Sequence, residues 1–408
     1  MSRTGLSIKI VGGCYAAGMA ANTVPTPLYP LYQQRDQLDV SMVTLVYGVY
    51  AAGVLASLLM VGRVSDHVGR RPVLVASVAV QALGIVAFVL WPGLAGLLVA
   101  RVLSGLAVGI LTPTASAYLA DLYADAGPDR AARVGTAANF GGLAAGPLMA
   151  GTLGQWAPAP LVLPHLVHAA LLAWAFAGLR LVPETRIAVS GWRYHPQRPA
   201  IPDSGRGLFW SAAWGNLLAF AVLGIFVGMV PEFLAAIGHG GSPALSGAAV
   251  SAVLAAGAVT QLFTDRLKRT RLVVSSLVLL LCGLTLGTVA IWTSGLVIFL
   301  LGGVLCGGGA GLLFKVSLAT GTTLSYGGHE RAGVLATLFL AAYVGMSVPV
   351  IGLGVAARHA DARVALTGFT ILATCVLGGV APGLLRRHPS RLAGNAVRCQ
   401  KVHRLPDN

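Results

Sequence analysis

Charged residues are scarce in this chain. Of its 408 residues only 10% are charged, whereas 56% are hydrophobic. Soluble globular proteins carry about a quarter charged residues, so the composition excludes that class. Apolar stretches of about 20 residues, each long enough to cross a bilayer as a helix, recur along the whole chain. A chain of this length has room for about twelve such helices, which leaves no room for a soluble catalytic domain.

Sequence motifs for disulfides, metal binding, ATP binding and hydrolytic catalysis are also missing. The five cysteines form no Cys-x-x-Cys pair, so we expect neither a disulfide nor a metal site. No Walker-type phosphate loop or catalytic triad is recognisable, which argues against ATP as the energy source and against an enzyme. All 13 Asp and Glu residues fall in loops or near predicted helix ends.

The apolar runs predict the fold class: an all-α integral membrane protein with twelve transmembrane helices in two pseudo-symmetric six-helix bundles. We expect the first run to be an uncleaved helix, although the start of the chain resembles a signal peptide. The helices are predicted at 10–32, 42–61, 72–91, 94–118, 134–156, 159–182, 208–230, 244–264, 272–293, 295–319, 332–356 and 364–385.

The positive charges orient these helices. The net charge of +15 would suggest nucleic acid in a soluble protein, but here most of the 28 Lys and Arg residues cluster between apolar runs on one side. The other side has Arg35, Arg358 and Arg363, and only Arg101 and Lys315 lie inside helices. The positive-inside rule therefore puts both termini in the cytoplasm of a bacterial cell. We expect the bilayer and a small molecule as partners, no nucleic acid, and a monomer.

A repeat divides the chain. GRVSDHVGRRP follows the second run and QLFTDRLKRTR follows the eighth, so that Asp66 and Asp265 lie about 200 residues apart. Pro147 and Pro349 are separated by nearly the same distance. Such a duplication suits a transporter that rocks two bundles about a central site. The predicted parts are an N-terminal bundle at 1–183, a polar linker at 184–207, a C-terminal bundle at 208–385 and a basic tail at 386–408.

The loop after the second helix carries the most specific pattern, formed by Gly62, Asp66, Gly69, Arg70 and Arg71. The glycines permit a tight turn, and the arginines suit an anionic membrane surface. This G-x-x-x-D-x-x-G-R-R string resembles the signature loop of the major facilitator superfamily. The resemblance covers the whole chain in helix count and loop lengths, and it implies a secondary transporter whose loop acts as a latch.

The resemblance also implies a partner for the latch. In the family a loop arginine pairs with an acid at the end of the fourth helix, where this chain has Asp121. We expect Arg70 and Asp121 to hold the two halves together on the inner side. The alternative is that Asp121, Asp125 and Asp129 are ordinary solvated loop acids.

Arg101 lies inside the fourth predicted helix, where a charge costs about 2.5–3.5 kcal/mol even on the lenient insertion scale. Together with Gly105 it is similar to a second family motif, whose arginine is associated with proton coupling. The alternative is a structural arginine satisfied by backbone carbonyls. Lys315 is expected to extend to the nearby membrane surface.

The fifth helix contains Gly142, Gly146, Pro147 and Gly151. Small residues at this spacing allow close helix packing, which is one interpretation. The pattern also resembles the motif of the exporting antiporter branches of the superfamily, and so does the string VPET, Val182 to Thr185. The second interpretation predicts export.

Prolines near the end of the first helix predict a break that lines a cavity. Polar and aromatic residues on several helices are candidates for its walls, although ordinary packing would also explain each of them. The predicted substrate cavity consists of Asn22, Tyr47, Asn139, Trp214, Asn216 and Tyr343.

The function predicted from the sequence is export of a small, apolar or cationic, antibiotic-like compound by proton antiport, without a cofactor. The proton carrier would be one of Asp66, Asp121, Glu232, His165 and His168, or proton coupling is absent. An uptake symporter or facilitator for a sugar or organic acid on the same fold is the alternative. A membrane protein that does not transport anything is a remote alternative.

Overall fold

The computed structural model describes residues 3–62, 64–124, 127–186, 194–325, 328–356, 359 and 361–386. These residues form helices and no strands. The elements are α1 (Arg3–Thr23), η1 (Thr26–Leu28), α2 (Tyr29–Asp36), α3 (Val40–Val61), α4 (Val64–Val68), α5 (Arg70–Leu90), α6 (Leu94–Leu122), α7 (Pro128–Trp156), α8 (Leu163–Leu179), α9 (Arg206–Ala236), α10 (Pro243–Phe263), α11 (Arg269–Thr293), α12 (Leu296–Leu324), α13 (Gly328–Ala356) and α14 (Ala362–Leu385).

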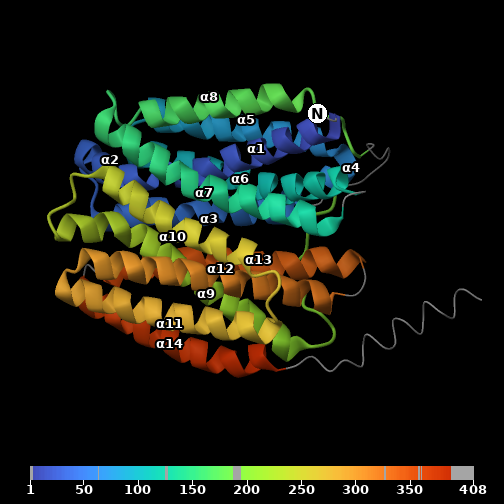
Figure 1. The fold of residues 1–408 in the computed structure, drawn as a ribbon. Coiled ribbons are helices and arrows are strands. Elements are labelled where there is room, and N and C mark those ends of the chain that lie inside the picture. The colour runs from blue at the N-terminus through green and yellow to red at the C-terminus, as the bar shows by residue number, and fades with distance from the viewer. Residues whose placement is uncertain are drawn as a thin grey trace, which may run out of the picture.

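Eleven of the twelve predicted spans correspond to one helix each, and the two six-helix bundles lie side by side (Figure 1). The N-terminal half comprises α1 to α8, drawn blue to green, and the C-terminal half comprises α9 to α14, drawn green to red. Within the described residues, nine helices are long and apolar enough to cross a membrane by length and composition, and α8 is a shorter apolar helix of 17 residues. The all-α membrane fold is therefore confirmed.

The first span, predicted at 10–32, is broken near its end, as its prolines predict. α1 starts at Arg3 and ends at Thr23, and the chain continues through the 3-10 turn η1 into the short helix α2. Pro25 and Pro27 explain the break, because proline lacks the N–H that would continue the helical ladder.

Other helix ends shift because of local capping. Asp39 caps α3 by accepting a hydrogen bond from the backbone N–H of Met42, and Ser242 caps α10 in the same way. α8 is shorter than the predicted span 159–182, whereas α7 starts several residues before the predicted 134. Of the predicted tail, residues 387–408 lie outside the described residues.

The halves meet where α3 packs on α13 and α7 packs on α10. We call the end that holds the N-terminus and α4 the linker end, and the opposite end the α2 end (Figure 1). The linker end is the one that the sequence predicts to be cytoplasmic.

Candidate functional site

Cavities lie in a row along the interface between the halves. One at the α2 end measures about 500 Å³, one at the linker end about 490 Å³, and a central one about 70 Å³. Tyr47 lines both the α2-end cavity and the central one. Thr112, Phe339 and Tyr343 line both the central cavity and the one at the linker end. The cavities thus share walls along one line through the molecule.

The central cavity contains most of the predicted substrate residues. Asn22, Tyr47, Asn139 and Tyr343 line it, together with Thr23, Thr26 and Thr112. The Nδ2 of Asn139 donates a hydrogen bond to the hydroxyl of Tyr15 at 2.7 Å. Most of the other lining side chains are apolar or aromatic, and none of the described lining side chains is charged.

Two predicted cavity residues on α9 lie elsewhere. Trp214 is 51% exposed and lines none of the three cavities. Asn216 is fully buried, and its Nδ2 donates a hydrogen bond to the backbone oxygen of Leu338 on α13 at 2.8 Å. Residues two apart on a helix point to different faces, so the pair does not share a cavity wall. Phe220, one turn after Asn216, does line the central cavity.

Aromatic rings connect the two halves around the central cavity. Tyr50 of the N-terminal half meets Tyr343 of the C-terminal half with ring centroids 6.4 Å apart. Phe140 and Phe314 make a second edge-to-face contact between the halves at 6.5 Å. Edge-to-face pairs at these distances are favourable, so the rings stabilise the contact between the halves.

Arg101 is buried in the N-terminal half, with 1% of its surface exposed. Its Nη1 donates a hydrogen bond to the backbone oxygen of Asn22 at 2.7 Å, and its guanidinium lies 4.6 Å from the ring centroid of Tyr50. The carbonyl of Asn22 is available because α1 ends one residue later. Nε of Arg101 has no hydrogen-bond partner among the described residues. Arg101 therefore lies behind the cavity wall rather than in it.

The latch loop forms the pair expected from the sequence. Nε of Arg70 lies 3.1 Å from Oδ2 of Asp121, and Nη1 of Arg70 lies 2.6 Å from Oδ1 of Asp66. Asp121 also pairs with Arg186, with Nη2 to Oδ1 at 3.1 Å, and this carboxylate raises the pKa of Arg186. Asp121 is thus not an isolated solvated acid. Asp125 lies outside the described residues.

Glu184, the acid of the VPET string, caps α5. Its two carboxylate oxygens accept hydrogen bonds at 2.9 Å from the backbone N–H groups of Arg70 and Arg71. A negative charge is favourable at a helix N-terminus. Gly69 precedes this cap with φ of +113°, and a Cβ there would lie 2.9 Å from a Glu184 oxygen. The sequence suggested the export resemblance of this string but not its capping contact.

The position of the latch contacts corrects one expectation. Asp66, Arg70 and Asp121 belong to the N-terminal half, and Glu184 is the first residue of the linker that follows it. Their mutual contacts therefore do not hold the two halves together. Arg70 is the first residue of α5, and both of its ion-pair partners lie in its own bundle.

A different acid connects the halves at the linker end. Asp265 lies in the loop between α10 and α11. Its Oδ2 lies 3.0 Å from Nε of Arg133 on α7, and its Oδ1 lies 2.5 Å from Nζ of Lys315 on α12. The hydrogen bond from Lys315 lowers the pKa of Asp265, so the carboxylate is charged at neutral pH. Lys315, which was expected to extend to the membrane surface, reaches the loop after α10 at the linker end and pairs there with Asp265.

The linker also joins the halves. The backbone N–H of Gln197 donates a hydrogen bond to the oxygen of Leu59 on α3 at 2.7 Å. The backbone N–H of Ala200 donates to the oxygen of Gly333 on α13 at 3.1 Å. Gln197 also lines the linker-end cavity. The linker therefore connects α3 with α13 and contributes Gln197 to the wall of that cavity.

The fifth-helix motif forms helix crossings. Gly142 and Gly146 pack on the backbone of α1, and Gly151 packs on Gly247 of α10. A Cβ on Gly151 would lie 3.0 Å from the Cα of Gly247. The motif therefore provides close contacts both inside its own bundle and across the interface between the halves.

The remaining candidates for proton transfer are separated in space. Glu232 lines the α2-end cavity, whereas Asp66 and Asp121 lie at the linker end. His165 and His168 are buried in the N-terminal half, and Nε2 of His165 lies 2.7 Å from the hydroxyl of Tyr32. Neither histidine lines one of the three cavities.

A named relative shares part of the chain. A protein from Mycolicibacterium hassiacum named triacylglyceride transporter is 31% identical over 237 residues. The match covers 57% of this chain and 40% of that protein, so this chain matches less than half of the relative's length.

Solved structures share the fold. A POT family transporter in complex with 5-aminolevulinic acid has a TM-score of 0.74 at 12% identity, covering 94% of this chain and 96% of its own. A mutant of the nucleoside transporter NupG has a TM-score of 0.72 at 12% identity, covering 93% and 99%. The human organic anion transporter TETRAN has a TM-score of 0.67 at 17% identity, covering 92% and 100%.

The likeness to these solved structures agrees with the match of the sequence to a family model. The family model described as Major Facilitator Superfamily matches residues 11–350, which is most of the chain. Together with the two six-helix bundles and the cavities between them, this match shows that the chain is a multi-pass membrane transporter belonging to the Major Facilitator Superfamily.

Proposed function

We propose that this transporter exports a small, apolar or cationic compound across the bacterial cytoplasmic membrane in exchange for protons. In this proposal it works as a monomer without a cofactor, takes its energy from the proton gradient, and has both termini in the cytoplasm. Its antibiotic-like substrate would move by alternating access between the two halves.

The row of cavities is the observation that carries the proposal. Each outer cavity, at about 500 and 490 Å³, is within the range of small-molecule sites, about 300–1,000 Å³. The central cavity of about 70 Å³ is far below that range. A substrate can therefore pass the centre only when the halves move apart, which is what alternating access supplies.

The charges along this route favour a neutral or cationic substrate. The only charged side chains that line the three cavities are the carboxylates of Asp39 and Glu232, within the described residues. Arg101 and Lys315 would be the natural partners of an anion, but neither lines a cavity. An organic acid, the substrate of the uptake alternative, would find no cation there.

Two further observations support export of an apolar compound. The Gly142 to Gly151 motif resembles that of exporting antiporters, and here it forms the crossing of α7 and α10. The relative from Mycolicibacterium hassiacum is named for an apolar cargo.

Movement of the halves has to break identifiable contacts. At the linker end these are the Arg133–Asp265 pair and the hydrogen bonds of residues 194–200. Near the α2 end, Oγ of Ser347 donates a hydrogen bond to the backbone oxygen of Gly48 at 3.0 Å. Exposed ion pairs contribute only about 0–1 kcal/mol each, so the linker-end contacts can open without a large barrier.

Everted membrane vesicles test the proposal with ethidium, an apolar cation, as the probe. An acidic vesicle interior should drive ethidium accumulation, and nigericin, which collapses the pH gradient, should abolish it. Vesicles without the protein are the control. Accumulation in right-side-out vesicles with an inward proton gradient would favour the uptake alternative, and absence of proton dependence would refute antiport.

A further inference from the structure

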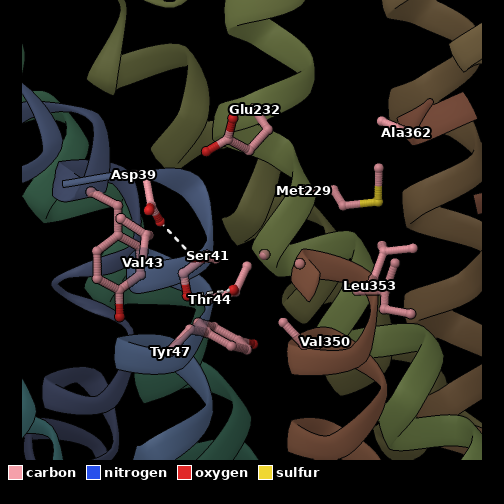
Figure 2. A pocket seen from close by; sticks show the side chains of 14 residues that line it. Asp39, Ser41, Val43, Thr44, Tyr47, Met229, Glu232, Val350, Leu353 and Ala362 are labelled. Carbon is pink, nitrogen blue, oxygen red and sulfur yellow. Dashed lines mark hydrogen bonds between the residues drawn. The ribbon is translucent and has the colours of Figure 1, made fainter. Parts of the chain in front are cut away.

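The cavity at the α2 end has an unusual combination of lining groups. It is bounded by α2 and α3 on one side and by α9, α13 and the start of α14 on the other (Figure 2). Met229, Val350 and Leu353 provide an apolar wall. Asp39 and Glu232 provide two carboxylates, and no lysine or arginine is among the described lining residues.

Glu232 is the carboxylate that needs a partner. It is half-buried on the last turns of α9, and its oxygens point across the cavity toward the Asp39 side (Figure 2). The amide of Gln33 on α2 hydrogen-bonds with it, but no lysine or arginine of the described residues forms an ion pair with it. A carboxylate taken out of water without a cation loses hydration that one amide restores only in part. Asp39 differs, because it accepts hydrogen bonds from Ser41 and from the N–H of Met42.

Two tyrosines give an independent sign of a ligand. Tyr29 and Tyr47 are each 4% exposed and line the same cavity, and neither hydroxyl has a hydrogen-bond partner among the described residues. Their rings meet edge to face at 6.5 Å. Buried hydroxyls are normally hydrogen-bonded, and tyrosine faces attract organic cations. The guanidinium of Arg101 lies 5.9 Å from the Tyr47 ring centroid, and Arg101 does not line the cavity.

We propose that the α2-end cavity is a binding site for an organic cation. Glu232 holds the positive group beside Asp39, Tyr29 and Tyr47, and the apolar part of the ligand packs on Met229, Val350 and Leu353. The proposal rests on the proposed function in one respect, since it narrows the exported compound to a cation. The cavity opens at the end predicted to be extracellular, so the site would hold the substrate on the release side.

Equilibrium binding to the purified transporter in nanodiscs tests this site without any transport step. The probe is tetraphenylphosphonium, and triphenylphosphine oxide is a neutral aryl probe. Glu232→Gln should weaken tetraphenylphosphonium binding by about 10- to 100-fold, the range for loss of a charged partner, and leave the neutral probe unaffected. Glu232→Asp, which keeps the charge, should retain part of the affinity.

Asp36→Asn is the matched control, because Asp36 lies at the same end of the molecule but pairs with Arg35 outside the cavity. It should change tetraphenylphosphonium binding little. Unchanged binding by Glu232→Gln, an equal loss in Asp36→Asn, or an equal loss of both probes would overturn the site. If the vesicle assay shows no export but Glu232→Gln still weakens binding of tetraphenylphosphonium and not of the neutral probe, the proposed function fails and the site stands.

Discussion

Replacing Gly151 by alanine should separate the two halves at the α7–α10 crossing. The added Cβ would lie 3.0 Å from the Cα of Gly247 and closer still to the backbone oxygen of Pro243. Both are backbone atoms that cannot rotate away. Non-bonded heavy atoms are most stable at about 3.5 Å or more, so the helices have to move apart by about 1 Å.

The cost of that movement sets the expected size of the effect. Overpacking of this kind costs about 1–3 kcal/mol, which corresponds to a shift of about 5- to 150-fold in a two-state equilibrium. We therefore expect Gly151→Ala to disfavour the conformation in which α7 and α10 touch and to slow transport at least about fivefold.

Gly141→Ala is the matched control, because Gly141 lies on the same helix with nothing within 4 Å of the added Cβ. Electron–electron distance measurements between spin labels at Trp156 and Gly241, in a cysteine-free background, report the separation directly. Gly151→Ala should lengthen this distance and Gly141→Ala should not. The same distance and the same ethidium flux in both variants would refute the close crossing.

Three further perturbations test the other contacts. Glu184→Gln removes the charge from the N-terminus of α5 and should lower stability by about 0.3–1 kcal/mol; an unchanged melting temperature of the purified protein would contradict the capping role. Lys315 lowers the pKa of Asp265, so the stabilisation from their pair should be complete above about pH 4, the ordinary aspartate pKa, and should be lost as the pH falls through the lowered pKa. In melting curves recorded at a series of pH values, Asp265→Asn should remove this acid-dependent loss of stability. If the loss persists in the variant, other groups cause it. Arg101→Ala should abolish pH-driven ethidium transport and leave downhill equilibration, whereas Arg101→Lys should retain some coupling because the charge remains; uphill export by Arg101→Ala at the wild-type rate would make the arginine purely structural.

Local sequence features correctly predicted the membrane helices, the break in the first helix and one ion pair. The apolar runs predicted the membrane helices, because an apolar helix of about 20 residues spans the hydrocarbon and satisfies its backbone hydrogen bonds internally. Pro25 and Pro27 predicted the broken first helix. The Arg70–Asp121 pair was expected from the family motif, and the structure forms it at 3.1 Å.

The faces of the helices were harder to predict. Trp214 and Asn216 were both expected in the cavity, yet one is half exposed and the other binds α13. Lipid tails are as apolar as leucine side chains, so the face of a membrane helix that contacts lipid can be as apolar as the face that contacts other helices. The sequence pattern then does not show which face points inward. Only the packing of α9 against its neighbours decides which face lines the cavity.

The sequence by itself determined that this chain spans a membrane with two related halves, and it located the charged loops and breaks between them. These properties depend on residues close together in the chain. Only the tertiary structure decided that Glu184 caps α5, that Asp265 rather than Asp66 pairs across the halves, and that Glu232 shares a cavity with Tyr29 and Tyr47. Such contacts join residues more than 100 positions apart, and helix packing sets their geometry.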